Sequence, residues 1–116
     1  MSRKLSSRVL YQDRTVALTE ETLVLRGFTK VLGRARRIQI DQITSFRLRP
    51  QSEFPNGQLP KWGIDDRNVW YTRDSRRWRR QSAIEVTFIN GETVGFSPAH
   101  ANRFQELLLQ LGVKEE

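Results

Sequence analysis

The clearest pattern of hydrophobic and polar residues lies in the last third of the chain. Hydrophobic side chains at positions 84, 86 and 88 alternate with their neighbours, which is the period expected of a strand with one buried face. Asn90-Gly91 follows, and both residues accept the positive φ that a type I′ turn requires. The pattern therefore predicts a hairpin whose second strand spans residues 92–96.

A helix is predicted directly after this hairpin. Ser97-Pro98 combines a helix-capping residue with the proline favoured at the first helical position, and Gly112 marks the end of the helix. Hydrophobic residues recur between them on one face: Phe104, Leu107, Leu108 and Leu111. A helix this short is not stable in water with its hydrophobic face exposed. We therefore expect this face to pack against the rest of the fold and seal an opening in it.

The preceding residues form short alternating segments separated by turns. We predict strands in the segments 14–18, 22–28, 36–40, 44–49 and 61–72. Residues 50–60 contain several turn-forming residues and are predicted to form a long surface loop. The expected fold is mostly β with one C-terminal α-helix. It is a partly open barrel, or two roughly orthogonal antiparallel sheets of about seven strands, capped by the helix.

The size and composition of the chain are consistent with one small domain. The chain has 116 residues, no cysteine and a net charge of +7. The absence of cysteine excludes disulfides and thiolate metal sites. We predict a flexible arm over residues 1–8, a single domain over 9–113 and a tail over 114–116.

The expected location follows from two negative observations on the sequence. Residues 1–8 lack the hydrophobic stretch of a secretion signal. No segment approaches the roughly 20 apolar residues that a membrane-spanning helix needs. We expect a cytoplasmic protein, with peripheral attachment to a membrane as an alternative.

Several strings, in this order, resemble the bacterial family of PH-like (pleckstrin-homology-like) domains. They are Leu18-Thr19-Glu20-Glu21-Thr22-Leu23, Ile38-Gln39-Ile40-Asp41-Gln42-Ile43, Trp62-Gly63-Ile64 and the segment from Ile84 to Leu111. The resemblance covers residues 9–113 and implies the same fold, and a binding or assembly module rather than an enzyme. Eukaryotic relatives often bind phosphoinositides through basic residues in the first hairpin loop. The corresponding turn here is acidic and would repel phosphate, so that lipid site is not carried over.

Catalytic residues are hard to find in this sequence. His100 is the single histidine and has no nucleophile that the sequence pairs with it. Asp65-Asp66 are adjacent residues of an extended segment, whose side chains point to opposite faces and chelate a metal poorly. Metal-ligand spacing and a phosphate-binding glycine loop are also absent. We therefore expect a protein that is not an enzyme, without cofactor or metal and with no small-molecule substrate implied.

Two clusters of basic residues are candidates for binding anions. The first combines arginines with one indole: Arg73, Arg76, Arg77, Trp78, Arg79 and Arg80. The second precedes the strand at 36–40: Lys30, Arg34, Arg36 and Arg37. Guanidinium groups bind phosphate oxygens in a forked geometry, and an indole stacks on a base or sits at a lipid surface. The alternative is an ordinary solvated surface whose arginine stems cover Trp78.

These observations leave three hypotheses of function. The first is a non-enzymatic PH-like module that binds a protein, either a second copy or a neighbour, through its surface and its sheet edges. On this hypothesis an exposed Trp62 or Trp70 would mark the interface, whereas buried tryptophans would belong to the core. The other two are a nucleic-acid-binding module and a module for anionic membranes, both using the segment 73–80.

Overall fold

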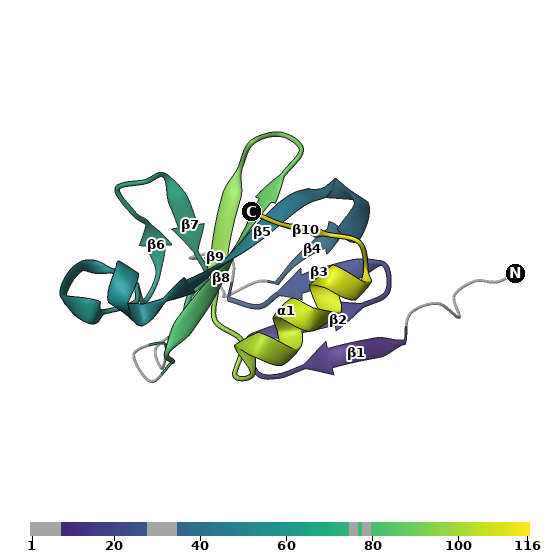
Figure 1. The fold of residues 1–116 in the computed structure, drawn as a ribbon, viewed down its shortest axis with the longest axis horizontal. Helices are drawn as coiled ribbons and strands as arrows, with labels where there is room; N and C mark the ends of the chain where they lie inside the picture. Colours follow the sequence, from purple (N-terminus) through teal and green to yellow (C-terminus); the bar gives the residue numbers. More distant parts are fainter. Residues whose placement is uncertain (1–7, 28–34, 75–76, 78–79) are drawn as a thin grey trace, which may run out of the picture.

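Two β-sheets and one C-terminal helix make up the fold of this chain (Figure 1). The computed structural model describes residues 8–27, 35–74, 77 and 80–116. One sheet has four strands in sequential order: β1 (Val9–Gln12), β2 (Val16–Thr19), β3 (Thr22–Leu25) and β4 (Arg36–Gln39). The mostly β fold with a terminal helix is as predicted, and the sheets do not close into a barrel.

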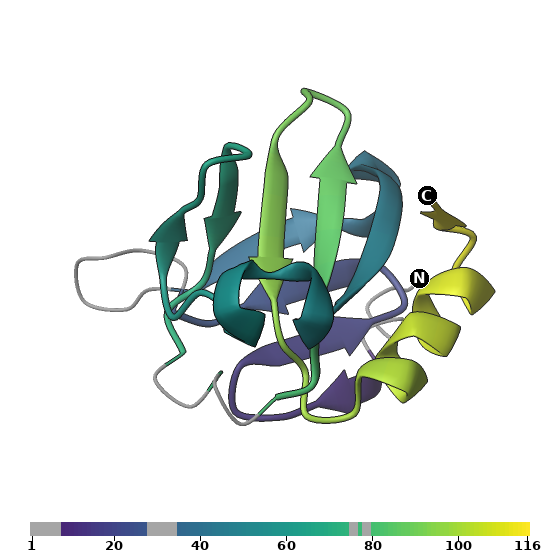
Figure 2. The same ribbon diagram turned by 60° about the vertical axis from the view of Figure 1, so that its left-hand side comes forward.

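The second sheet has six strands in the order β10-β5-β8-β9-β7-β6. Their bounds are β5 (Ile43–Pro50), β6 (Gly63–Ile64), β7 (Val69–Tyr71), β8 (Ser82–Phe88), β9 (Thr93–Phe96) and β10 (Lys114–Glu115). Helix α1 (Ala101–Gln110) follows β9, as predicted, but it begins later than the pattern indicates: its N-cap is His100, whereas the sequence predicts a start at Ser97-Pro98. Figure 2 shows β6 and β7 on the side of this sheet away from α1.

The structure corrects the prediction of purely antiparallel sheets in two places. β7 lies parallel to β9, and β10 lies parallel to β5. Both pairs join segments that are not consecutive: β8 separates β7 from β9, and strands β6 to β9 and α1 separate β5 from β10. Local sequence does not specify such returns to the sheet. Residues 114–116, predicted to be a tail, therefore continue the sheet, and the amide of Glu116 donates to the carbonyl of Phe46 at 2.8 Å.

Other differences concern where strands begin and end. Residues 9–12, which no predicted strand includes, form β1. The predicted strand 61–72 is divided into β6 and β7 by a turn at which Asp65 accepts hydrogen bonds from the amides of Arg67 and Val69. Residues 51–57 form two short 3₁₀ turns, η2 (Gln51–Glu53) and η3 (Pro55–Gly57), within the predicted loop.

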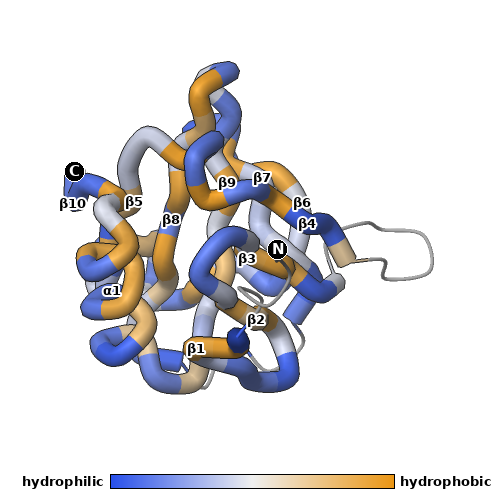
Figure 3. Tube along the Cα trace, turned by 90° about the vertical axis from the view of Figure 1, so that its right-hand side faces the viewer, coloured by the Kyte–Doolittle hydropathy of each residue, from blue (hydrophilic) through white to orange (hydrophobic). Residues whose placement is uncertain are grey.

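Helix α1 seals the main core, as its hydrophobic face predicts. Phe104 and Leu108 are fully buried, and hydrophobic and hydrophilic positions alternate along the helix (Figure 3). The Phe104 ring packs edge-on against Tyr11 of β1 at 5.1 Å and against Phe96 of β9 at 5.4 Å, measured between ring centroids. The helix thus contacts both sheets at once. No helix in the described part of the chain is long and apolar enough to cross a membrane.

The turn between β1 and β2 is tied to the start of the helix by one carboxylate. Asp13 accepts hydrogen bonds from the Tyr11 hydroxyl at 2.6 Å and from the Ala99 amide at 2.8 Å. Burial opposes the ionisation of Asp13, but the hydrogen bonds from Tyr11, Ala99 and Thr15 outweigh it and hold the pKa of Asp13 below its ordinary value. Burial, and then the hydrogen bond to Asp13, raises the pKa of Tyr11 to about 12.

Truncation of the helix at its sealing residue tests this core. Phe104→Ala is expected to lower the free energy of unfolding by about 3–5 kcal/mol, because it leaves a cavity between the two sheets. Leu109→Ala is the matched control, since Leu109 lies on the same helix and is 46% exposed. Urea denaturation of both variants measures the difference. Equal stabilities would contradict the assigned helix face.

The Asp13–Tyr11 pair predicts a loss of stability at both ends of the pH scale. Because the folded pKa of Asp13 is below 3.8, its contribution is complete above that pH and is lost as the pH falls further. Tyr11 contributes fully below pH 10, and its contribution is lost as the pH rises toward 12. Urea denaturation at a series of pH values measures the free energy of unfolding. Below pH 3.8 this free energy should fall less steeply for Asp13→Asn than for the wild type. The exposed Asp41→Asn should show the same fall as the wild type.

Candidate functional site

The structure separates the basic residues that the sequence grouped together. Four of them and the tryptophan between them lie outside the described residues, and for these anion binding stays a prediction: Lys30, Arg34, Arg76, Arg79 and Trp78. Arg37 and Arg73 are exposed, and Arg80 is partly buried. Arg36 and Arg77 are engaged inside the protein.

Arg77 is the largest fully buried side chain among the described residues. Its guanidinium donates to the carbonyls of Pro60 and Thr72 at 2.8 and 2.7 Å and to the Ser97 hydroxyl at 2.9 Å. It also lies 5.4 Å from the centroid of the Tyr71 ring. Burial, with a smaller contribution from the charge of Arg80, lowers the pKa of Arg77 to about 10, so it stays charged at neutral pH.

These contacts correct the expectation that Arg77 binds an external anion. Its donors are directed at acceptors in three separate segments. Pro60 lies at the end of the long loop, Thr72 directly follows β7 and Ser97 directly follows β9. A guanidinium suits this position because its fork of donors satisfies several acceptors at once. The run of arginines in the sequence carries no signal that one of them turns inward.

Arg36 has an internal partner as well. Its two terminal nitrogens donate to the two carboxylate oxygens of Glu92 at 2.9 and 3.0 Å, and its guanidinium lies 5.1 Å from the Phe88 ring centroid. The hydrogen bonds from Arg36 hold the pKa of Glu92 below its ordinary value. This bidentate pair links β4 of one sheet to the β8–β9 turn of the other, which accounts for the placement of Arg36 without an external ligand.

A buried charge cluster lies on the outer face of the six-stranded sheet. Glu85 accepts hydrogen bonds from the two terminal nitrogens of Arg67 at 3.1 and 2.7 Å and from the hydroxyl of Tyr71. Arg49 approaches the same carboxylate at 3.6 Å. Burial raises the pKa of Tyr71 above its ordinary range, and the hydrogen bond to Glu85 adds to that shift.

In the predicted strand 44–49, alternation with Phe46 and Leu48 puts Arg49 on the face away from the core. A solvent-exposed side chain is expected there, and the structure shows that this expectation is wrong. Its side chain is 9% exposed, because residues 51–60 fold back over the outer face of the sheet. Phe54 from this segment lies 5.2 Å from the Arg49 guanidinium, measured to the ring centroid. A second small core forms there: Phe54, Leu59, Val69, Tyr71 and Ala83. Glu85 and Tyr71 of the charge cluster are therefore buried parts of the fold, whereas Arg49 and Arg67 also line a pocket of about 740 Å³ beside it.

The hydrophobic surface at the free end of the six-stranded sheet is the strongest candidate for binding. One row of directly paired residues crosses the sheet from β5 to β6: Phe46, Val86, Val94, Trp70 and Ile64. Directly paired residues share a face, so the whole row points to the side of the main core. Its first three members are fully buried, Trp70 is partly buried and Ile64 is 61% exposed.

This change along the row has a simple cause. The six-stranded sheet extends beyond the four-stranded sheet and helix that cover it, so its last two strands carry core-type residues into solvent. Trp62 adds to the same surface, since it is 39% exposed and its ring packs edge-on against Trp70 at 6.3 Å. We call Trp62, Ile64 and Trp70 the overhang surface. The sequence marks both tryptophans as possible interface residues but gives no separate signal for Ile64.

No protein-family model matches this chain, and the searches of curated proteins and of solved structures find no match either. The described residues contain no group of three or more side chains suited to hold a metal ion. His100 lies at the exposed start of α1.

The role assigned to Arg77 predicts a large effect on stability. Arg77→Met is expected to lower the free energy of unfolding by about 3 kcal/mol or more, because it leaves several buried carbonyls without a donor. Arg73→Met removes the same charge from an exposed position and should change stability by about 0.5 kcal/mol or less. Guanidinium denaturation compares the two variants. If both are as stable as the wild type, the assigned role is wrong.

Proposed function

We propose that this chain is a non-enzymatic PH-like module that assembles with a second copy of itself through the overhang surface. The observation that carries the proposal is the row of core-facing residues that leaves its cover and ends at the exposed Ile64. Contiguous aromatic and aliphatic side chains at a sheet edge are typical of protein interfaces.

The backbone at this edge supports pairing between copies. The amide of Asp65 donates to the carbonyl of Val69 at 3.0 Å, so the backbone groups of Asp65 face β7. In an antiparallel pair successive residues alternate in direction, so the amide and carbonyl of Ile64 face away from β7, toward the side of β6 on which no described strand pairs. Two copies related by a twofold axis can exchange a pair of hydrogen bonds between their Ile64 residues.

The charges on either side of β6 favour this antiparallel arrangement. Lys61 precedes the strand and Asp66 follows it, while Asp65 is paired with Arg67 at 2.6 Å. Both Lys61 and Asp66 are exposed. When two copies of β6 run in opposite directions, the basic end of one meets the acidic end of the other. A parallel arrangement would place like charges together, which disfavours it.

The chain offers a closely matched pair of positions for testing the assembly. Ile64 and Ile89 are 61% and 62% exposed, but Ile89 lies beyond the end of β8, outside the overhang surface. Ile64→Glu is expected to weaken the dimer about a hundredfold or more, because each interface loses two buried isoleucines of about 2 kcal/mol each. Ile89→Glu should leave it unchanged. Light scattering after size-exclusion chromatography measures the mass over a range of concentrations.

Cross-linking gives an independent readout, since the natural chain has no cysteine. Under mild oxidation Ile64→Cys should form a disulfide-linked dimer readily, because a twofold axis brings both copies of position 64 together. Ile89→Cys should remain mostly monomeric. A wild-type protein that stays monomeric at every concentration, together with equal cross-linking at both positions, would refute the proposed assembly.

A further inference from the structure

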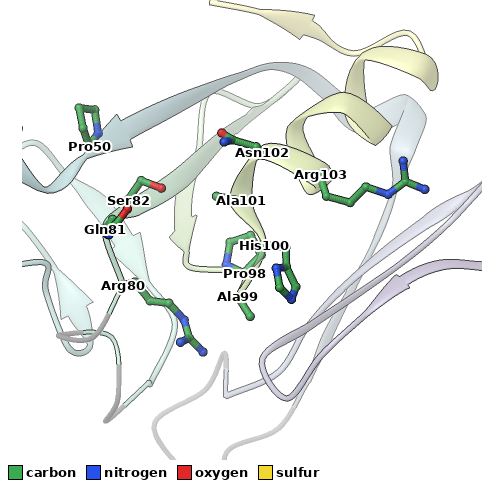
Figure 4. A pocket seen from close by; sticks show the side chains of 10 residues that line it. All are labelled: Pro50, Arg80, Gln81, Ser82, Pro98, Ala99, His100, Ala101, Asn102 and Arg103. Atoms are coloured by element: carbon green, nitrogen blue, oxygen red, sulfur yellow. The ribbon is translucent and has the colours of Figure 1, made fainter.

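A second site, independent of the overhang surface, lies at the start of helix α1. A pocket of about 720 Å³ opens between the segment leading into β8 and the first turn of the helix (Figure 4). Arg80 and Ser82 line one side, and His100, Asn102 and Arg103 line the other. In the view of Figure 4, His100 lies between the side chains of Arg80 and Arg103.

The described charged side chains that line this pocket are all basic. None of the described residues that line it is acidic, and Arg80 and Arg103 form no ion pair within the described part of the chain. The Nε atom of Arg80 is buried and has no hydrogen-bond acceptor there. The buried guanidinium of Arg77 lies close enough to Arg80 for their charges to interact, which adds to the positive potential behind the pocket.

Among the residues that the structure describes, the carboxylate of Asp13, near the start of the helix, forms no ion pair with the arginines of the pocket. Asp13 approaches the segment before the helix, but its two oxygens accept hydrogen bonds from Tyr11, Ala99, Thr15 and Val16. It is not among the residues that line the pocket. Its oxygens are therefore occupied by hydrogen bonds within the protein.

Arg103 lies where a basic side chain interacts unfavourably with the helix dipole. The first turn of α1 contains no acidic residue, although carboxylates are the side chains that the helix dipole favours there. Arg103 occupies this turn, and the preceding His100 has no side-chain hydrogen bond that caps the helix. A bound anion would compensate both features, so the local sequence is better suited to an occupied pocket than to an empty one.

We infer that this pocket binds a phosphate group, with Arg80 as the main donor and Arg103 and His100 on the opposite wall. Guanidinium groups match the oxygens of phosphate in a forked geometry, and Ser82 and Asn102 add neutral hydrogen-bonding groups. A concave pocket of this size suits a phosphate-bearing small molecule or a lipid headgroup. An extended nucleic acid would instead need a basic stripe across the surface.

Titration of the ¹⁵N-labelled full chain with inorganic phosphate tests the inference. At constant ionic strength, phosphate but not chloride should shift the side-chain Nε–H resonance of Arg80 and the amides of residues 100–103. Arg80→Gln and Arg103→Gln should each weaken binding, by about tenfold for Arg80, because each removes a charge-assisted contact. Arg37→Gln removes the same charge from an exposed position on β4 and should bind phosphate like the wild type.

Vesicles distinguish the two sources of phosphate. Co-sedimentation with equal parts of phosphatidic acid and phosphatidylcholine, but not with pure phosphatidylcholine, indicates a headgroup if Arg103→Gln abolishes it. Phosphate binding without co-sedimentation indicates a free phosphate compound.

Because Arg103 is exposed, its variant should fold even if Arg80→Gln does not. The inference fails if phosphate shifts none of these resonances, or if Arg37→Gln is as damaging as Arg103→Gln. It also fails if single-stranded RNA binds tightly and neither pocket variant changes that binding.

Discussion

The packing of Phe104 between the two sheets is the contact on which the fold depends. Its ring touches Tyr11 from the first strand and Phe96 from the last strand before the helix. Asp13 then fixes the start of the helix through Tyr11 and Ala99. Because α1 covers only one end of the six-stranded sheet, the other end carries core-type residues into solvent. The position of α1 therefore determines both candidate sites. The pocket lies at the start of the helix, and the overhang surface lies on the part of the sheet that the helix does not cover.

Local patterns predict the parts of the fold that local interactions decide. The terminal hairpin and helix are specified by alternation, by the Asn90-Gly91 turn and by the stripe of Phe104, and the structure confirms both elements. The predicted type I′ turn is wrong in one respect, because Gly91 has a positive φ but Asn90 does not. The parallel strand pairs, the second core under residues 51–60 and the burial of Arg49 arise from contacts between distant segments. A period of two on β5 indicates which residues face away from the main core, but not whether another segment covers them.

The environment of a basic side chain is harder to predict from sequence than that of a hydrophobic one. Arginine is long enough to reach inward or outward from the same backbone position, so its sequence neighbours do not fix its environment. Arg77 turns into the protein, Arg36 bridges the sheets, and Arg80 borders a pocket. The sequence did contain a signal for that pocket. Arg103 and His100 occupy the start of a helix where acidic residues are favoured, which marks an unusual charge distribution.

Strand β10 makes the two edges of the six-stranded sheet unequal. A sheet with two open edges can add copies at both sides and extend into a filament. Here β10 occupies the outer side of β5, and its two residues, Lys114 and Glu115, are exposed and charged. Short charged strands are poor templates for further pairing. Within the six-stranded sheet β6 is thus the better edge for pairing, and the proposed twofold contact would occupy it in both copies.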